Sequence, residues 1–106
     1  MSLAAAGGLV LAGEANLAEL RKDITRVTLE IFRLCGERLR IAEKIGEIKA
    51  CRKLPVENLH VEEELRNKVL EVCRENSIDT GFCVKLLDLL LQESKRVQRE
   101  TLRSGP

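Results

Sequence analysis

Two basic side chains occupy positions where the sequence predicts a buried apolar stripe. Apolar residues between positions 16 and 52 recur every three or four residues, which is the pattern of one long amphipathic helix. Arg38 interrupts this stripe between Leu34 and Ile41. Lys49 follows eleven residues later, on nearly the same face and roughly 16 Å along the axis. A buried guanidinium needs an oppositely charged partner. Two inward cations at this spacing could bind the two ends of a small dianion.

Polar groups also interrupt the apolar faces further along the chain. Asn58 and Glu62 continue the inward line of a predicted second helix, which runs from about 58 to 76. Ser94 and Gln98 continue the inward line of a third helix that ends near residue 102. The predicted pocket combines two cations, one carboxylate and two neutral hydrogen-bonding groups: Arg38, Lys49, Glu62, Ser94 and Gln98. This set of groups suits a hydroxylated dicarboxylate.

Each of these residues also has a structural interpretation. Long charged side chains in a helical bundle commonly lie on a solvated flank. Arg38 in a heptad core position can instead set the register of a partner helix, as buried polar residues do in coiled coils. The pattern alone therefore predicts a helical dimer with an anion pocket. Other charged residues are expected on solvated faces, among them Arg66, Lys68, Glu93, Lys95 and Arg96.

The elements that must position these groups form an all-α fold with three helices per chain. The first helix, over about 16–52 with Asn16 as its N-cap, would be roughly 55 Å long. A compact monomer of this size is only about 30 Å across. The long first helix must therefore project from its own core, and we expect an intertwined helical-bundle homodimer. Arg21 is roughly 25 Å from Arg38 along this helix, so it can share a small ligand with Arg38 only from the other chain.

Local signals place the remaining boundaries. A connector around Pro55 precedes the second helix, and Asp79 is the expected N-cap of the third. The leucine-rich middle of the third helix predicts a central buried element. Residues 1–15 are small and mildly apolar and are expected to form a flexible extension, leaving 16–103 as the domain.

Composition limits the class of protein. The chain has 106 residues, enough for one domain, with 44% hydrophobic residues, 2% aromatic residues and a net charge of +1. So few aromatic side chains argue against a β-sandwich and against base stacking with single-stranded nucleic acid. The near-neutral charge predicts no general attraction to nucleic acid or to an anionic membrane. No basic residue precedes Arg21, so no signal peptide is expected.

The four cysteines, Cys35, Cys51, Cys73 and Cys83, form no CxxC pair, and His60 is the single histidine. We therefore expect no zinc site. Cysteines on helical patterns are commonly small buried apolar residues, which fits a reducing, cytoplasmic location, although an even count is compatible with disulfides.

These residues together resemble the all-helical AroQ chorismate mutases. That family has an Arg near the start of the first helix, an ER pair, a G-x-x-K motif at the helix end, a loop Pro, an early Glu in the second helix and S-x-x-x-Q late in the third. The matching residues occur here in the same order over about 16–102: Arg21, Glu37, Arg38, Gly46, Lys49, Pro55, Glu62, Ser94 and Gln98.

The resemblance implies a role for each group. Arg38 and the partner chain's copy of Arg21 would bind the two carboxylates of chorismate, with Ser94 assisting. Lys49 and Gln98 would face the ether oxygen of the breaking bond. Asn58 and Glu62 would bind elsewhere on the substrate, Glu62 at the ring hydroxyl. The reaction would be the rearrangement of chorismate to prephenate, with no cofactor and no metal.

Two positions depart from the family pattern. Many relatives have Asp and Arg where this chain has Asn58 and Val61, so one supporting contact to the substrate is lost. Two other functions remain compatible with the sequence. One is isochorismate pyruvate lyase, a sister activity on the same fold, and the other is a non-catalytic helical dimer or metabolite-sensing module.

Overall fold

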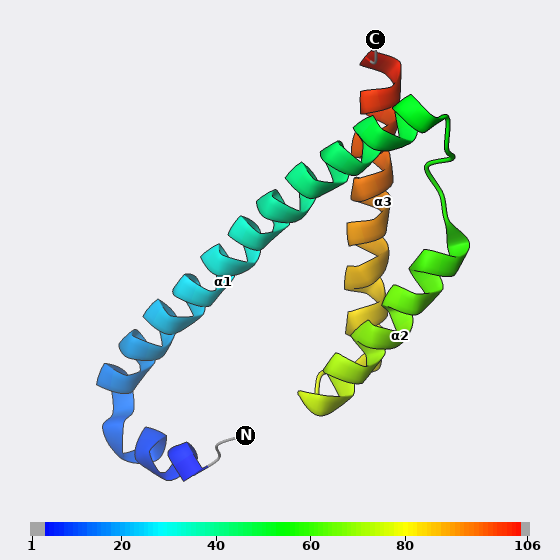
Figure 1. The fold of residues 1–106 in the computed structure, drawn as a ribbon. Helices are drawn as coiled ribbons and strands as arrows, with labels where there is room; N and C mark the ends of the chain where they lie inside the picture. Colours follow the sequence, from blue (N-terminus) through cyan, green and yellow to red (C-terminus); the bar gives the residue numbers. More distant parts are fainter. Residues whose placement is uncertain (1–3, 105–106) are drawn as a thin grey trace. The chain divides into compact units, whose positions relative to one another are not determined.

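The computed structural model describes residues 4–104, and within this range every regular element is a helix (Figure 1). The helices are α1 (Ala4–Arg52), α2 (Leu59–Glu75) and α3 (Thr80–Ser104). The prediction of an all-α chain with three helices and a long first one is confirmed. Side chains are described for residues 16–103, so the expected extension at 1–15 lies wholly outside the range in which packing is defined.

The start of α1 differs from the prediction. The helix begins at Ala4, and Asn16 therefore lies inside it and does not cap its first turn. Alanine has the highest intrinsic helix propensity, and no proline precedes Pro55 to end the helix. A sequence interpretation based on apolar periodicity starts only at Leu17, because the small residues before it show no clear amphipathic pattern.

The chain divides into two compact parts, Met1–Gly36 and Glu37–Pro106. Within the described residues, the first part is the N-terminal stretch of α1. Its large apolar side chains are exposed in the single chain, with Ile24 at 66% and Leu34 at 60% of full exposure. The exposed residues of the predicted stripe in this part are Leu17, Leu20, Ile24, Val27, Ile31 and Leu34.

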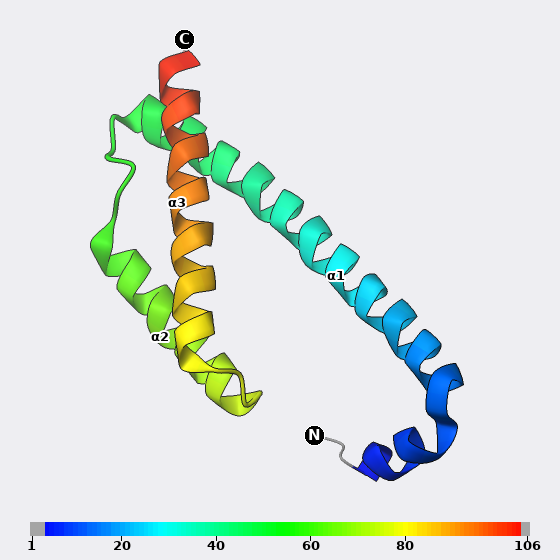
Figure 2. The ribbon, with the colours of Figure 1, turned by 180° about the vertical axis from the view of Figure 1, so that it is seen from behind.

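The second part contains the end of α1 together with α2 and α3. The last two helices form an antiparallel hairpin and lie side by side in both ribbon views (Figures 1 and 2). Its best-buried apolar residues are contributed by all three helices: Ala42, Cys73, Cys83 and Leu87. This small core packs the helices that present the polar groups predicted above.

Capping interactions explain where α2 and α3 begin. The Asn58 side chain accepts a hydrogen bond from the backbone N–H of Val61 at 3.2 Å, and α2 follows directly. The Asp79 carboxylate accepts one from the N–H of Phe82 at 2.9 Å, which confirms Asp79 as the N-cap of α3. Each side chain satisfies a backbone N–H that has no partner inside its helix.

Two residues in the left-handed backbone region end the preceding helices. Lys53 has φ 57° just after α1, and Ser77 has φ 56° just after α2. In the first case the N–H of Leu54 returns to the carbonyl of Lys49 at 2.8 Å. This is the usual way in which a helix satisfies its last carbonyls and turns the chain sharply away.

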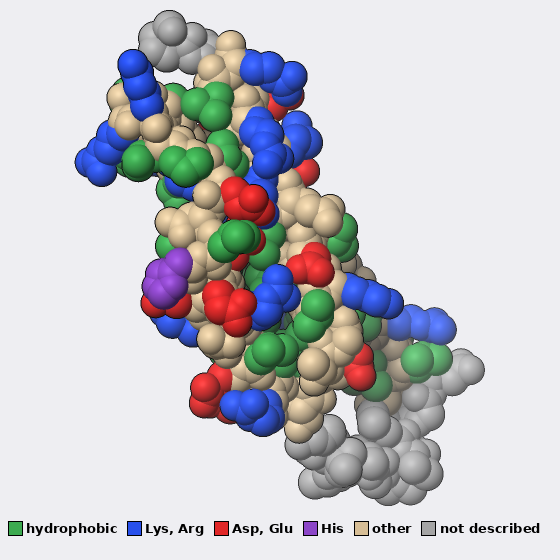
Figure 3. All heavy atoms as spheres, turned by 90° about the vertical axis from the view of Figure 1, so that its right-hand side faces the viewer, with side chains coloured by type: hydrophobic (Ala, Val, Ile, Leu, Met, Phe, Trp, Pro, Cys, Tyr) green, Lys and Arg blue, Asp and Glu red, His purple; other side chains and the backbone are tan. Residues whose placement is uncertain are grey.

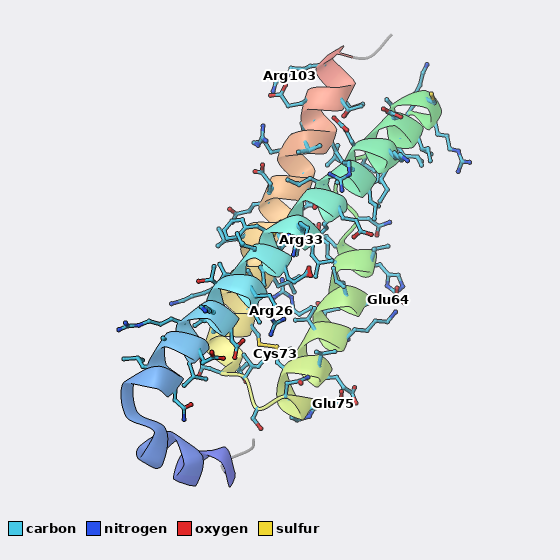
Figure 4. All side chains as sticks on the ribbon, turned by 90° about the vertical axis from the view of Figure 1, so that its left-hand side faces the viewer. Arg26, Arg33, Glu64, Cys73, Glu75 and Arg103 are labelled. Carbon is cyan, nitrogen blue, oxygen red and sulfur yellow. A yellow bond between two sulfur atoms is a disulfide. The ribbon has the colours of Figure 1, made fainter. Side chains whose placement is uncertain are left out.

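The cysteines differ from the prediction in two ways. Cys73 and Cys83 are buried as expected, but they form a disulfide that joins α2 to α3, with their Cα atoms 6.7 Å apart (Figure 4). Cys51 is exposed, so it is not a buried apolar residue. Helical periodicity places Cys73 and Cys83 on inward faces, but it does not show that the turn between the helices brings the two faces together.

Several leucines and valines expected in the core are exposed in the single chain. Leu59 is 69% exposed, Val72 53% and Leu89 63%. In the second part of the chain, α2 and the end of α1 cover only one face of α3. The middle of α3 is apolar all round, so some of its apolar residues stay exposed.

Elsewhere, acidic and basic side chains lie beside one another on the surface (Figure 3). None of the described helices has an apolar stretch long enough to cross a membrane.

Candidate active site

A cavity of about 470 Å³ lies in the second part of the chain. This volume is in the range of small-molecule sites. The cavity is lined by residues of all three helices and of the connector: Arg38, Ile41, Ala42, Ile45, Lys49, Val56, Asn58, Val61, Glu62, Leu65, Leu91, Ser94, Lys95 and Gln98. Seven of these fourteen residues are aliphatic, and the other seven are polar or charged.

Arg38 reaches from α1 to α3. Its Nη1 donates hydrogen bonds to the carbonyl oxygen of Leu90, at 3.1 Å, and to the hydroxyl of Ser94. Ser94 is buried, with 9% of its surface exposed. These bonds fix the guanidinium at the cavity wall through one nitrogen. Since a guanidinium carries five N–H donors in a planar fork, the others remain suited to a carboxylate ligand.

Lys49 stands in the last turn of α1, where the chain leaves the helix. Its Nζ donates to the carbonyl oxygen of Val56 at 2.6 Å and so holds the connector against the cavity. An ammonium has three N–H donors, which leaves donors for a ligand oxygen. The side chain is partly buried, so its charge is less screened than that of a surface lysine.

Gln98 presents a polar group without a protein partner. It is only 7% exposed, and its Oε1 accepts no hydrogen bond from any side chain or backbone group within residues 16–103. Leaving a buried amide oxygen unpaired costs about 1–3 kcal/mol. Such a group at a cavity wall is typical of a ligand-binding position, since rotation of the amide presents either its oxygen or its NH₂ to a ligand.

Gly46 explains how Gln98 comes so close to α1. A Cβ added at Gly46 would lie 3.0 Å from the Cα of Gln98 and 3.3 Å from its Cβ. Contacts of this length are tighter than most real Cβ contacts, so the neighbouring helix would have to give way. The missing side chain therefore lets α1 and α3 approach at the position from which Gln98 enters the cavity.

Glu62 faces the cavity from the first turn of α2 and is paired with Lys95 of α3. The Lys95 Nζ lies 2.9 Å from Oε2 of Glu62 and 2.9 Å from Oε2 of Glu57. These carboxylates, Glu62 first, raise the pKa of Lys95, and the same ammonium lowers the pKa of Glu57. The raised pKa keeps Lys95 an ammonium at neutral pH.

Lys95 is the polar residue of the cavity that the sequence analysis missed. It was expected on a solvated face, but its side chain is 19% exposed and lines the cavity. A signal was present: Lys95 lies four residues after Leu91, which also lines the cavity, so the two share one side of α3. Arg66, also expected on a solvated face, is partly buried and pairs with Asp88 at 3.2 Å.

The structure brings together six of the seven residues predicted for the site. Arg38, Lys49, Asn58, Glu62, Ser94 and Gln98 all line the one cavity. Arg21 belongs to the first part of the chain and is exposed. With Lys95 included, the lining contains three cations and one carboxylate, so the cavity favours an anion.

Comparison with known proteins identifies the family of the chain. Residues 20–99 match the model of the family described as chorismate mutase type II, a range that contains every predicted site residue. The chain belongs to the chorismate mutase type II family and is an enzyme of the isomerase class.

Relatives match over different shares of their length. A chorismate mutase of Methanocaldococcus jannaschii is 28% identical over 87 residues, which are 82% of this chain and 88% of the relative. The bifunctional chorismate mutase/prephenate dehydratase of Aquifex aeolicus is 44% identical over 60 residues, 57% of this chain and 17% of the relative. The enzyme of the same description from Escherichia coli is 23% identical over 93 residues, 88% of this chain and 24% of the relative. The chain thus spans most of the archaeal relative and about a quarter or less of the two bifunctional ones.

Proposed function

We propose that this enzyme catalyses the intramolecular [3,3] rearrangement of chorismate to prephenate, a step of aromatic amino-acid biosynthesis. The observation that carries the proposal is the cavity into which Arg38, Lys49 and Gln98 project from two helices, beside aliphatic side chains. The rearrangement breaks one C–O bond and forms one C–C bond within the same molecule. It requires no nucleophile, redox step or net proton transfer, and hence no cofactor.

Substrate binding uses the charges of the cavity. The guanidinium of Arg38, held by Ser94, binds one carboxylate of the substrate, and Arg21 of a second chain binds the other. Glu62 accepts a hydrogen bond from the ring hydroxyl, and Asn58 supports this end of the site from the N-cap of α2. The aliphatic walls formed by residues such as Ile45 and Leu65 restrain the substrate in a compact conformation. Such orientation removes a large part of the barrier of an intramolecular reaction.

The second contribution to catalysis is electrostatic. Negative charge grows on the ether oxygen as its bond to carbon breaks. Lys49 and Gln98 donate hydrogen bonds to that oxygen, and a preorganised donor in a cavity shielded from water stabilises the transition state more than the substrate. The Oε1 of Gln98 has no hydrogen-bond partner within the described residues, which supports this role, because no bond through that atom holds the amide in one orientation.

An intertwined homodimer completes the site. The apolar stripe on the first part of α1 is exposed in one chain, and a second copy of the same stripe is the simplest cover for it. In an antiparallel arrangement the partner's α1 also brings Arg21 to the cavity. A cytoplasmic location stays a prediction, and the Cys73–Cys83 disulfide weighs against it, because disulfides are rare in reducing compartments.

The decisive assay follows chorismate by its ultraviolet absorbance and identifies the product. Prephenate is expected as the product, whereas pyruvate would indicate the lyase activity and unchanged chorismate a non-catalytic dimer. Arg38→Ala should abolish turnover. Arg96→Ala is the matched control, because Arg96 is exposed and pairs on the surface with Glu93 at 2.7 Å. The proposal is wrong if wild type consumes no chorismate or if both variants are equally active.

A further inference from the structure

Lys95 joins three elements around the cavity. It stands on α3, its ammonium contacts Glu62 on α2, and it also contacts Glu57 in the connector, with both Nζ–Oε2 distances at 2.9 Å. The side chains of Lys95 and Glu62 are each 19% exposed, whereas that of Glu57 is 52% exposed. The contact with Glu62 is therefore the more buried of the two, and it lies at the cavity wall.

The charge of Glu62 needs a counterion at this position. A carboxylate that faces the cavity repels the carboxylates of a dianionic substrate, and such repulsion is stronger in a partly buried site than in water. Arg38 and Lys49 do not offset Glu62 directly, because their observed bonds go to Ser94, Leu90 and Val56. The ammonium of Lys95 is the cation in contact with Glu62 among the described residues.

The geometry of this pair leaves Glu62 able to bind a ligand. Lys95 contacts Oε2 of Glu62, so the second carboxylate oxygen, Oε1, is suited to accept a hydrogen bond from a hydroxyl. Glu57 holds the ammonium from the solvent side and so limits the positions that Lys95 can adopt. The pair thus fixes the orientation of the Glu62 carboxylate and places a positive charge beside it.

We infer that Lys95 is a positioning residue of this site. It holds the Glu62 carboxylate at the cavity wall and neutralises it, so that Glu62 binds the substrate hydroxyl without repelling the dianion. This inference rests on the proposed function. Lys95 affects substrate binding only through Glu62. This effect differs from a general stabilisation of the α2–α3 hairpin.

The test is a double-mutant cycle between Lys95→Met and Glu62→Gln, with kcat and KM for chorismate measured for each variant. Lys95→Met should raise KM about tenfold and change kcat less, because the uncompensated charge of Glu62 opposes binding in both the ground state and the transition state. In the Glu62→Gln background the same substitution should change KM less than about twofold, because no carboxylate remains to be neutralised. Lys95→Arg should restore most of the binding.

Two controls separate this effect from loss of folding. Arg96→Met alters the neighbouring exposed residue and should leave KM unchanged. Glu57→Gln should raise KM less than about threefold, because Lys95 retains its contact with the Glu62 carboxylate. Circular dichroism and thermal unfolding identify any variant that fails to fold. If Lys95→Met fails to fold, Lys95→Gln replaces it in the double-mutant cycle.

Equal losses from the Lys95 substitution in both backgrounds, or no rescue by arginine, would overturn the inference while leaving the proposed function intact. A folded wild-type protein that does not turn over chorismate would overturn both.

Discussion

Gln98 places a neutral amide in a cavity whose other proposed donor to the ether oxygen, Lys49, is charged. Its side chain is buried and its Oε1 has no partner within the described residues. A neutral donor is useful here because it needs no protonation, so its contribution is independent of pH. The sequence predicted this residue from its position seven residues after Leu91, on the same face of the third helix.

The Gln98→Glu variant tests this role by making the donor depend on pH. At pH 7 an ionised carboxylate would face the ether oxygen as that oxygen becomes negative, so kcat should fall by about 10²–10³, the usual effect of losing one transition-state donor. In acid the carboxyl regains its proton and donates again, so kcat should rise as pH decreases. The measurement is the pH profile of kcat for wild type and variant.

Gln98→Met is the matched control for this profile. It has a similar shape and no donor at any pH, so its low kcat should not recover in acid. Two results would contradict the role of Gln98 as a donor to the ether oxygen. One is a wild-type kcat of Gln98→Glu at neutral pH. The other is a folded Gln98→Glu enzyme with the same flat pH profile as the methionine variant.

At the scale of the helices, the contact of α1 with α3 at Gly46 determines where Gln98 lies. Alanine at Gly46 would place a Cβ 3.0 Å from the Cα of Gln98, so the helices must separate by a few tenths of an ångström. We expect Gly46→Ala to lower kcat about tenfold or more, because small displacements of catalytic groups have large effects.

Stability should respond differently to this substitution. Alanine is favoured over glycine in a helix by about 1 kcal/mol, which offsets part of the loss in packing. The expected result is therefore a Tm close to wild type together with reduced kcat, and Gly46→Val should be worse in both measurements. A fully active Gly46→Ala enzyme would show that the close approach of the helices is not needed for catalysis.

The disulfide is the second feature at this scale. It closes a loop of ten residues between α2 and α3, which corresponds to a stabilisation of about 3 kcal/mol in the chain-entropy model. We expect a reductant to lower Tm, and the double variant Cys73→Ala and Cys83→Ala to have the same lowered Tm with and without reductant. Cys51→Ser should leave the response to reductant intact, since Cys51 is not paired. No change in the Tm of wild type upon verified reduction would contradict this stabilising role.

How far the sequence predicts these elements depends on how local the signal is. Asp79 caps α3 through a contact within three residues, and it was predicted as that cap. Asn58 was expected on the inward line of the second helix, but it caps α2, which begins at Leu59. The expected cap of the first helix, Asn16, was wrong, because α1 begins at Ala4. The Cys73–Cys83 bond and the Lys95–Glu62 pair depend on how two helices face each other, which periodicity within one helix does not determine.

At the scale of the whole molecule, the proposed active site requires two chains. The exposed apolar stripe of the first part of α1 includes Ile24 at 66% and Leu34 at 60%. Removing such a stripe from water is favourable by about 25 cal/mol for each Å² of apolar surface. Light scattering or sedimentation at micromolar concentration should therefore give twice the chain mass of 11.9 kDa. A folded, active monomer would contradict both the dimer and the shared site.

The most direct test of the central claim, a cavity completed by the partner's Arg21, uses mixed dimers of two inactive variants. Arg21→Ala and Arg38→Ala should each be nearly inactive alone. Random mixing makes about half of the dimers heterodimers, each with one cavity that has both arginines, so about a quarter of wild-type activity should return. If Arg21 instead served its own chain, neither cavity of a heterodimer would have both arginines. No recovery of activity, with heterodimers shown to form, would contradict the shared site.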